Sequence, residues 1–486
     1  MTERIIHLLT YHADEPMLFS TGLFLILFLG FTFIYMLLQH TLTMRLLFVT
    51  AFSYYFYYKS SGFYFGLLAV VTLSDYLIAS ILSKHKSKWL VALSLLIDLG
   101  MLGYFKYTNF FAGMWAQMIG SNFQPWDIFL PVGISFFMFQ SISYVIDVYR
   151  GELKPLPSLL DYAFYVSFFP QLVAGPIVRA RDFAPQIRKP LVITSWMFAQ
   201  GCYLIAIGLF KKAVISDYIS LNYVDRIFDN PSLYSGVENL LGVYGYTLQI
   251  YCDFSGYSDM AIGIALLLGF RFPMNFNAPY RSESITDFWH RWHISLSSWI
   301  RDYIYIPLGG NRKGKVRQNV NLIITMLLGG LWHGASLNFI AWGGIHGVAL
   351  AVHKWLRENV FHHDKHYRSS GLKWVFSVLL TFHFVAFCWI FFRNQTFEAS
   401  WTMIHQIYSN FHPELFVQVV SGYWMVFAFM LLGYLTHFTP DSLQNRIIRL
   451  LERGGVVVCA LLIVVVIYIV IQVKSSEIQP FIYFQF

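Results

Sequence analysis

Two histidines stand out because they lie in apolar sequence, where an ionisable side chain is costly. His293 lies in the run FWHRWHISLSSWIRDYIYIPLGGNRKG, and His333 lies in LLGGLWHGASLNFIAWGGIHG. Ionisable groups at membrane depth are tolerated where they face a cavity or a partner, so both are candidates for function. A buried neutral imidazole takes up and returns a proton near neutral pH and can act as a general base. For His333, the residues alone leave catalysis and a hydrogen-bonded core histidine equally open.

Other histidines raise the question of a metal site. His290 and His293 are three residues apart, which predicts a shared helix face. Two such ligands do not make a zinc site, and the glutamate of an HExxH arrangement is missing. His362, His363 and His366 resemble a metal cluster, although a run of histidines in an exposed polar loop is the simpler interpretation. We therefore expect no metal.

The composition is that of a membrane protein. Of the 486 residues, 57% are hydrophobic and only 12% are charged, about half the charged fraction of a soluble protein. Apolar segments recur along the chain with no long polar region between them, so we expect one polytopic membrane domain, residues 1–486. The net charge of +8 fits Lys/Arg-rich cytoplasmic loops better than nucleic-acid binding.

The elements that must position the histidines are apolar segments of helical length and the breaks between them. The segment 131–151 carries a polar stripe that suits a helix facing protein or a water-filled cavity, and Pro170, Gly175 and Pro176 predict a broken helix further on. Residues 288–308 hold too many ionisable groups for a lipid-exposed span, so a re-entrant or cavity-lining helix is expected there. The expected spans are 17–39, 44–58, 62–83, 89–107, 162–173, 194–214, 240–270, 322–342, 374–392, 420–437 and 455–473.

Between the expected spans, three polar or small-residue features matter. A polar loop is expected after Lys212, and the basic loop 308–319 is expected to be cytoplasmic. The glycines around His333 permit close approach of neighbouring helices. These are Gly329, Gly330, Gly334, Gly343, Gly344 and Gly347.

A second polar cluster lies within the expected span 240–270. Asp253, Tyr257 and Asp259 stand among hydroxyl groups in the run YCDFSGYSDMAIG. Two carboxylates in such a setting suggest acid/base work or a cation site. A hydrogen-bonded structural cluster at a helix break fits the same spacing.

Four of these runs together resemble the membrane-bound O-acyltransferase family. They are FFPQLVAGPIVR, YCDFSGYSDMAIG, FWHRWHISLSSWIRDYIYIPLGGNR and LLGGLWHG, in that order. The similarity covers most of the chain and is densest over residues 130–350, the expected catalytic core. Within the family, IPLGGNRKG is more similar to the bacterial alginate O-acetyltransferase membrane subunits than to the D-alanyl transferases of teichoic acid.

The resemblance implies an all-α integral membrane fold, with about 11 transmembrane helices and re-entrant helices around a central funnel. His333 matches the histidine of the family's LWHG motif and is the expected catalytic base, and His293, from WHIS, is expected to be the second catalytic residue. His290 is left out of the catalytic pair. Residues expected to bind substrate or line the cavity are Arg291, Trp292, Trp332, Asp253 and Tyr257, of which Asp253 and Tyr257, with Asp259, match a signature interpreted as structural or cavity-lining.

The implied reaction is transfer of an acyl group, most simply acetyl, from a cytoplasmic thioester to an extracytoplasmic hydroxyl. The donor is coenzyme A or an acyl carrier protein, used as a substrate, and no bound cofactor is expected. In alginate-type relatives the acyl group passes to a separate extracytoplasmic transferase, so an SGNH-type partner and an exopolysaccharide are expected. The expected location is the bacterial cytoplasmic (inner) membrane, with many passes.

Two other functions remain open at this point. A transporter or channel with broken helices around an intramembrane polar site would show inverted repeats, and none is clear in the sequence. A non-catalytic scaffold for envelope polysaccharide machinery would retain acetylation after mutation of both histidines.

Overall fold

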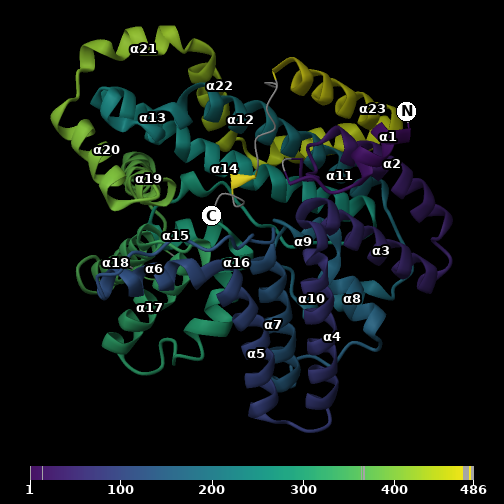
Figure 1. Ribbon diagram of the computed structural model, residues 1–486. Coiled ribbons are helices and arrows are strands. Elements are labelled where there is room, and N and C mark those ends of the chain that lie inside the picture. Colours follow the sequence, from purple (N-terminus) through teal and green to yellow (C-terminus); the bar gives the residue numbers. More distant parts are fainter. Residues whose placement is uncertain (1, 14, 363, 365–366, 474–480, 483–486) are drawn as a thin grey trace. The chain divides into compact units, whose positions relative to one another are not determined.

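The computed structural model describes residues 2–13, 15–362, 364, 367–473 and 481–482. Throughout these residues the chain forms helices and connecting loops (Figure 1), and none of the described residues lies in a strand. The expected all-α class is therefore confirmed. His363 and His366 of the histidine run lie outside the described residues, and no group of three potential metal ligands occurs among those described.

The chain folds as two compact units. The first comprises Met1–Ala206, Tyr257–Pro273 and Leu451–Ala460. The second comprises Ile207–Gly256, Met274–Leu450 and Leu461–Phe486. Three helices have residues in both, namely α11 (Ser195–Leu209), α14 (Gly236–Leu267) and α23 (Asp441–Val473). That the two units form one membrane domain, with a catalytic core at 130–350, stays a prediction.

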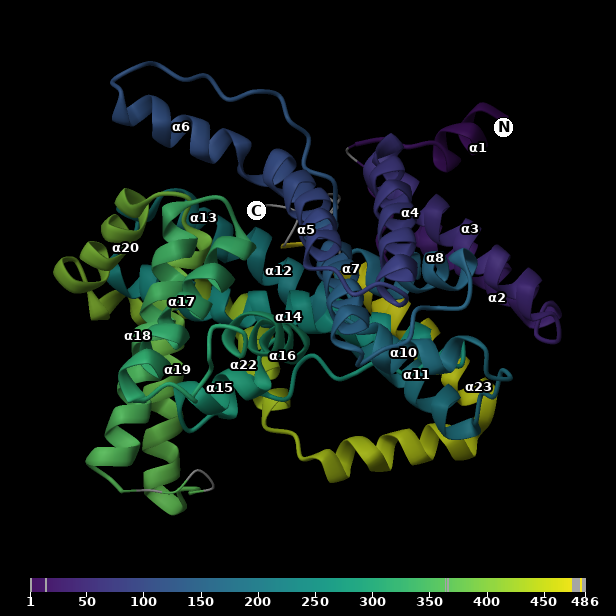
Figure 2. The same ribbon diagram turned by 90° about the horizontal axis from the view of Figure 1, so that it is seen from below.

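The first unit is a bundle in which three helices pack against one another (Figure 2). They are α4 (Phe65–Leu82), α5 (Lys88–Leu102) and α7 (Ile134–Arg150). The polar stripe of α7 is buried: Gln140, Ser141 and Asp147 have no exposed surface, and Ser141 is hydrogen-bonded to the Tyr162 hydroxyl at 2.8 Å. The expectation that this helix faces protein is confirmed. The helices of this unit are α1 (Thr2–Leu9), α2 (Gly22–Leu37), α3 (Leu42–Ser61), α4 (Phe65–Leu82), α5 (Lys88–Leu102), α6 (Thr108–Met118), α7 (Ile134–Arg150), α8 (Leu159–Ser167), α9 (Phe169–Leu172) and α10 (Ala180–Ile187).

The predicted helix break near Pro170 is present. Helix α8 ends at Ser167, and α9 adds only one turn before the chain becomes irregular. A Cβ on Gly175 would lie 2.6 Å from the Gln171 Cα, so this turn of backbone is too tight for a larger residue.

The second unit holds both histidines. Helices α17 (Lys315–His333) and α18 (Leu337–Asn359) form an antiparallel pair, and α19 (Gly371–Arg393) packs beside α18 (Figure 2). Its helices are α12 (Asp217–Ile219), α13 (Asp225–Asp229), α15 (Ile285–Arg291), α16 (Ile294–Ile300), α17 (Lys315–His333), α18 (Leu337–Asn359), α19 (Gly371–Arg393), α20 (Phe397–Ser409), α21 (Phe416–Gly422) and α22 (Trp424–His437), with wider π-helical turns at Phe210–Ser216, Ser220–Val224 and Arg301–Tyr305.

Glycines set the distance between α17 and α18. A Cβ on Gly330 would lie 2.1 Å from the Phe339 carbonyl oxygen, and one on Gly343 would lie 2.2 Å from that of Met326. A Cβ on Gly347 would reach 2.9 Å from the Ile323 Cα. The expected close approach of neighbouring helices is confirmed at these three positions. There the backbone of one helix contacts the backbone of the other.

Two local expectations are wrong. The polar loop expected after Lys212 is helical as far as Asp229, because its carboxylates and hydroxyls find partners inside the protein; Asp225, for example, accepts a hydrogen bond from Ser220 at 2.6 Å. The cluster around Asp253 does not lie at a helix break, because α14 is one continuous helix of 32 residues.

Five helical stretches of the described chain are long and apolar enough to cross a membrane, or six if a bent pair counts as one span. They confirm a multi-pass membrane protein, and the count of about 11 stays a prediction. Within residues 285–305, α15 has seven residues, and α16, also of seven, continues directly into a π-helical turn of five. Both helical stretches are well below the roughly 20 residues that a helical span needs. This is consistent with the prediction that the segment is no ordinary span.

We expect Gly343→Ala to destabilise the protein, because the added methyl meets a backbone carbonyl that cannot rotate away. Overpacking of this kind costs roughly 1–3 kcal/mol, measurable as a lower melting temperature of the purified protein in detergent. The matched control is Gly30→Ala in α2, where nothing lies within 4 Å of the new Cβ. Equal melting temperatures for the two variants would contradict the backbone contact.

Candidate active site

A sharp turn between two short helices positions His293. The Ser284 side chain caps α15 by accepting a hydrogen bond from the Asp287 N–H, and α15 ends at Arg291. His293 then adopts a left-handed backbone conformation, with φ 44° and ψ 54°, which is uncommon for any residue but glycine. The turn is held because the Asn275 carbonyl accepts from Ile294 N–H at 2.9 Å, and the Asn275 side chain accepts from the Ser295 hydroxyl at 2.8 Å.

This turn overturns the prediction that His290 and His293 share a helix face. The helix ends between them, so their spacing of three residues no longer sets their directions. His290 is exposed, whereas His293 has no exposed surface.

His333 is the last residue of α17, where Gly334 leaves the helix in an extended conformation. Its side chain is 2% exposed. Edge-to-face contacts surround the ring, with centroid distances of 4.9 Å to Trp332, 5.1 Å to Trp342 and 5.2 Å to Phe392. Three aromatic rings thus pack against the His333 imidazole.

The Trp332 ring links the two histidines. It lies 6.0 Å from the His293 ring and 4.9 Å from that of His333, centroid to centroid. On its other side, His293 packs 4.7 Å from Phe254. The two candidate catalytic residues thus belong to one aromatic cluster, although they are 40 positions apart in the sequence.

A cavity of about 320 Å³ opens beside His333. This is the lower end of the size range of small-molecule sites. Walls from α15, α16, α17 and α18 enclose it, and polar side chains are interspersed with apolar ones. The lining residues with hydroxyl, imidazole or guanidinium groups are Thr286, His290, Ser297, Ser298, Arg301, Tyr305, Thr325 and His333.

Three hydroxyls of the lining, those of Ser297, Ser298 and Thr325, already donate to backbone carbonyls. Ser298 donates to the Ser295 oxygen at 2.9 Å, and Thr325 to the Asn321 oxygen at 2.6 Å. Their remaining capacity toward a ligand is as acceptors. Trp342 also lines the cavity, and its buried indole N–H has no hydrogen-bond partner among the described residues.

Four residues expected to bind substrate lie within the second unit but not among the lining residues of this cavity. Trp292 is 1% exposed and packs 5.0 Å from Trp389, and Trp332 lies between the histidine rings. Arg291 pairs with Asp287 at 3.0 Å. A role of any of them in substrate binding stays a prediction.

Asp253, the fourth, is 2% exposed and forms an ion pair of 2.6 Å with Lys212, itself 3% exposed. It also accepts a hydrogen bond at 2.7 Å from the backbone N–H of Ile482, near the end of the chain. Lys212 reaches Asp217 as well, at 2.8 Å. The carboxylate therefore joins three distant segments of the second unit.

Tyr257 belongs to the first unit, where its ring stacks on Phe19 at 4.6 Å. Of the seven predicted site residues, only His333 lines the cavity among the described residues.

Sequence reasoning missed several residues of the cavity. Trp342 and the hydroxyl residues were not predicted, because nothing in a helical or alternating pattern marks residues that converge from four elements. His290 was considered with His293 but left out of the catalytic pair. One signal was available: a tryptophan in a glycine-rich run beside His333 has both the bulk and the N–H donor of a site residue.

Comparison with known proteins places the chain in a family. Residues 152–352 match the model of MBOAT, the membrane-bound O-acyltransferase family. The "Probable alginate O-acetylase AlgI" of Azotobacter vinelandii is 44% identical over 403 residues, which cover 81% of this chain and 78% of that protein. The chain belongs to the membrane-bound O-acyltransferase family. It is thus an O-acyltransferase, and the transporter and scaffold hypotheses lose their support.

Other members of the family act on different polymers, by their names. The peptidoglycan O-acetyltransferase of Helicobacter pylori is 37% identical over 420 residues, covering 79% of this chain and 78% of that protein. The teichoic acid D-alanyltransferase of Bacillus subtilis is 29% identical over 288 residues, covering 56% and 71%. These relatives are thus similar to this chain although they are named for different acceptor polymers.

We expect Asp253→Asn to lower the stability of the protein and leave the KM of the acyl donor unchanged. Breaking a buried ion pair costs roughly 3–5 kcal/mol, which appears as a lower melting temperature in detergent. The matched control is Asp229→Asn, because Asp229 is 63% exposed and lies 3.7 Å from Arg393, and exposed pairs contribute little. A raised KM with an unchanged melting temperature would instead assign Asp253 to substrate binding.

Proposed function

We propose that the protein transfers an acetyl group from a cytoplasmic thioester, acetyl-CoA or an acyl carrier, toward an extracytoplasmic polysaccharide, with His333 as the catalytic base. The observation that carries this proposal is a buried histidine in the wall of a small, partly polar cavity, at the end of a helix. The names of the relatives, which point to alginate and peptidoglycan acetylation, support the acetyl group and the polysaccharide.

In the proposed step, the acceptor hydroxyl lies against the His333 imidazole. The ring accepts the hydroxyl proton as the oxygen attacks the thioester carbonyl carbon. The tetrahedral oxyanion then collapses, the C–S bond breaks, and the imidazolium returns its proton to the leaving thiolate. An ester and a free thiol result, and no cofactor takes part.

The Trp342 indole N–H is the donor that we assign to the developing oxyanion. It is an unused buried donor on a residue of the cavity wall, and its ring packs edge-to-face on His333. His293 has a positioning role in this proposal, because it contacts Trp332, which in turn contacts His333.

The acceptor of the acetyl group is either a polysaccharide hydroxyl or a hydroxyl of a separate extracytoplasmic SGNH-type acyltransferase. In this proposal the chain crosses the bilayer several times. A donor on one side and an acceptor on the other therefore reach the same histidine. We therefore propose the bacterial cytoplasmic membrane as its location.

His333→Ala is expected to reduce acetyl transfer by roughly 10²–10⁴-fold, the contribution of a general base. The measurement is release of coenzyme A thiol by the purified protein in the presence of acceptor. The control is His405→Ala, because His405 is exposed on α20. A folded His333→Ala protein with full transfer activity would overturn the assignment.

Trp342→Phe tests the indole N–H apart from the aromatic ring. The phenyl ring retains most of the aromatic packing against His333 and Trp389 while the donor is lost. Removing one donor to an oxyanion costs roughly 10²–10³-fold in kcat, so we expect a lower kcat with little change in KM. An unchanged kcat would exclude the indole as the oxyanion donor, while leaving the assignment of His333 intact.

A further inference from the structure

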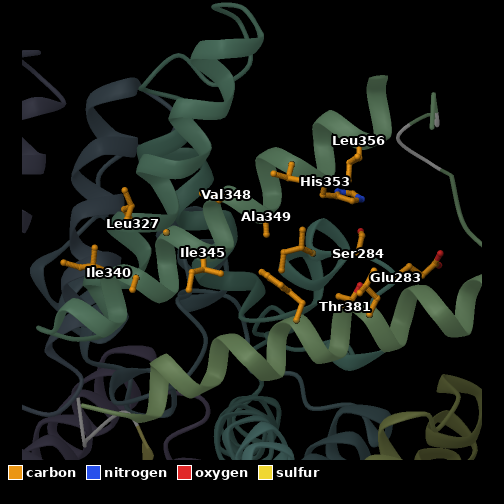
Figure 3. A pocket seen from close by; sticks show the side chains of 16 residues that line it. Glu283, Ser284, Leu327, Ile340, Ile345, Val348, Ala349, His353, Leu356 and Thr381 are labelled. Atoms are coloured by element: carbon orange, nitrogen blue, oxygen red, sulfur yellow. The ribbon is translucent and has the colours of Figure 1, made fainter. Parts of the chain in front are cut away.

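Two further hollows differ in the charge of their walls. One is an open groove of about 830 Å³ in the second unit, between α15, α18 and α19 (Figure 3). Its lining includes the acid Glu283 and no Lys or Arg, so it offers an anion no permanent positive charge. The other is a pocket of about 490 Å³ within the first unit. Its lining includes three cations, Arg45, Lys189 and Arg271, and no acid.

The basic pocket forms where four segments of the first unit meet. They are the first turn of α3, the end of α10 with the loop 188–194, the first turn of α11 and the chain just after α14. The Gln186 side chain holds two of them together, because it accepts a hydrogen bond from the Arg271 N–H at 2.9 Å and donates one to the Arg271 carbonyl at 3.1 Å. The Arg45 side chain joins α3 to the loop by donating to the Lys189 carbonyl at 3.3 Å. The pocket is thus enclosed by connected segments, and its volume is in the range of small-molecule sites.

Arg45 is a buried cation in the wall of this pocket. It is 3% exposed, and its Nε–H has no hydrogen-bond partner among the described residues. The hydrogen bond that its guanidinium does make goes to a neutral carbonyl. Taking a guanidinium out of water is costly unless a negative charge compensates it. An anion in the pocket would do so, and the planar guanidinium suits the oxygens of a phosphate group.

Three acids belong to neighbouring parts of the chain, but none of them lines the pocket. Asp161 pairs with Arg188 through hydrogen bonds of 2.8 and 3.0 Å. Glu452 accepts a hydrogen bond from the Ser195 hydroxyl at 2.9 Å, and Asp182 of α10 is exposed. Within the described part of the chain, none of the three lining cations forms an ion pair with an acid. The wall of the pocket therefore presents positive charge only.

The pocket lies at the ends of two candidate membrane spans. Arg45 is in the first turn of the stretch Leu42–Leu82, and Met197 is in the first turn of Ser195–Asp229. Both stretches are long and apolar enough to cross a bilayer, so their ends lie at the level of the lipid headgroups. The apolar side chains of the lining would face the first part of a lipid chain. They are those of Pro190, Leu191, Val192, Met197, Leu268 and Phe270.

We propose that this pocket binds the headgroup of one anionic phospholipid, with its phosphate oxygens at Arg45, Lys189 and Arg271. Basic pockets at the ends of membrane helices bind anionic headgroups for this electrostatic reason. A zwitterionic lipid would bring an ammonium group toward three cations. A soluble phosphate would meet the charge but leave the apolar part of the wall uncovered. The site lies in the first unit, and the proposal stands whether or not His333 is the base.

The test is native mass spectrometry of the delipidated full-length protein, titrated with phosphatidylglycerol or with phosphatidylcholine of the same chains. We expect tighter binding of phosphatidylglycerol. The double variant Lys189→Gln/Arg271→Gln, which changes two exposed side chains, should weaken that binding about 30-fold and leave phosphatidylcholine binding unchanged. The matched control is Arg312→Gln/Lys313→Gln, which removes two exposed cations from the loop before α17 and should have no effect.

Two further variants test the wall itself. Val192 is 62% exposed, so Val192→Glu should fold normally while placing a negative charge beside the phosphate, and it should weaken phosphatidylglycerol binding about fivefold. Arg45→Met removes the buried charge, a change that is often neutral for stability or favourable. Added phosphatidylglycerol should raise the melting temperature of the wild-type protein more than that of this variant, because only the wild-type protein binds it tightly.

Equal affinities of the wild-type protein for the two lipids would overturn the proposal. So would phosphatidylglycerol binding that the Lys189→Gln/Arg271→Gln variant leaves intact. Glycerol 3-phosphate or coenzyme A binding as tightly as the lipid, and displacing it, would also contradict the proposal, because the pocket would then be a site for a soluble phosphate.

Discussion

The backbone contact between α17 and α18 is the constraint on which the rest of the second unit depends. Glycine at positions 330 and 343 lets two helices meet without intervening side chains. In a protein surrounded by lipid, such packing supplies association energy that the hydrophobic effect between helices does not. Because α17 ends at His333 and α18 begins at Leu337, the same contact fixes the histidine against Trp342 of the opposite helix.

Around that contact, buried polar groups pair with nearby residues. This pairing offsets the free-energy cost of placing polar groups in an apolar protein. Lys212 is held between Asp217 and Asp253, and Arg291 by Asp287 and the Asn277 carbonyl. Polar groups that the described part of the chain does not pair are therefore informative. Trp342 lines the cavity, and its buried indole N–H has no hydrogen-bond partner among the described residues. A ligand in the cavity that carries an acceptor would supply one.

The family places this architecture in context. Relatives named for alginate, peptidoglycan and teichoic acid share a core with this chain, so the acceptor polymer is not encoded in the shared helices alone. In the proposed reaction, the small cavity beside His333 would hold a short acyl group and part of the thioester donor. Acceptor choice is then expected to depend on residues outside the cavity or on the partner protein.

The sequence by itself determined the class of the protein and most of its helical segments, and it singled out His333 as a candidate. Those conclusions follow from local properties, namely apolar composition, breaks at Pro170 and Gly175, and a histidine in a glycine-rich run. Four family motifs in order determined the family, which the comparisons confirm.

Only the tertiary structure decided which residues share a cavity. His290 and His293 point apart because a left-handed turn separates them, Asp253 pairs with Lys212 and Ile482 across the unit, and Trp342 converges on His333 from another helix. Convergence of side chains from separate helices depends on helix packing distance and rotation, and no periodicity within one segment carries that information.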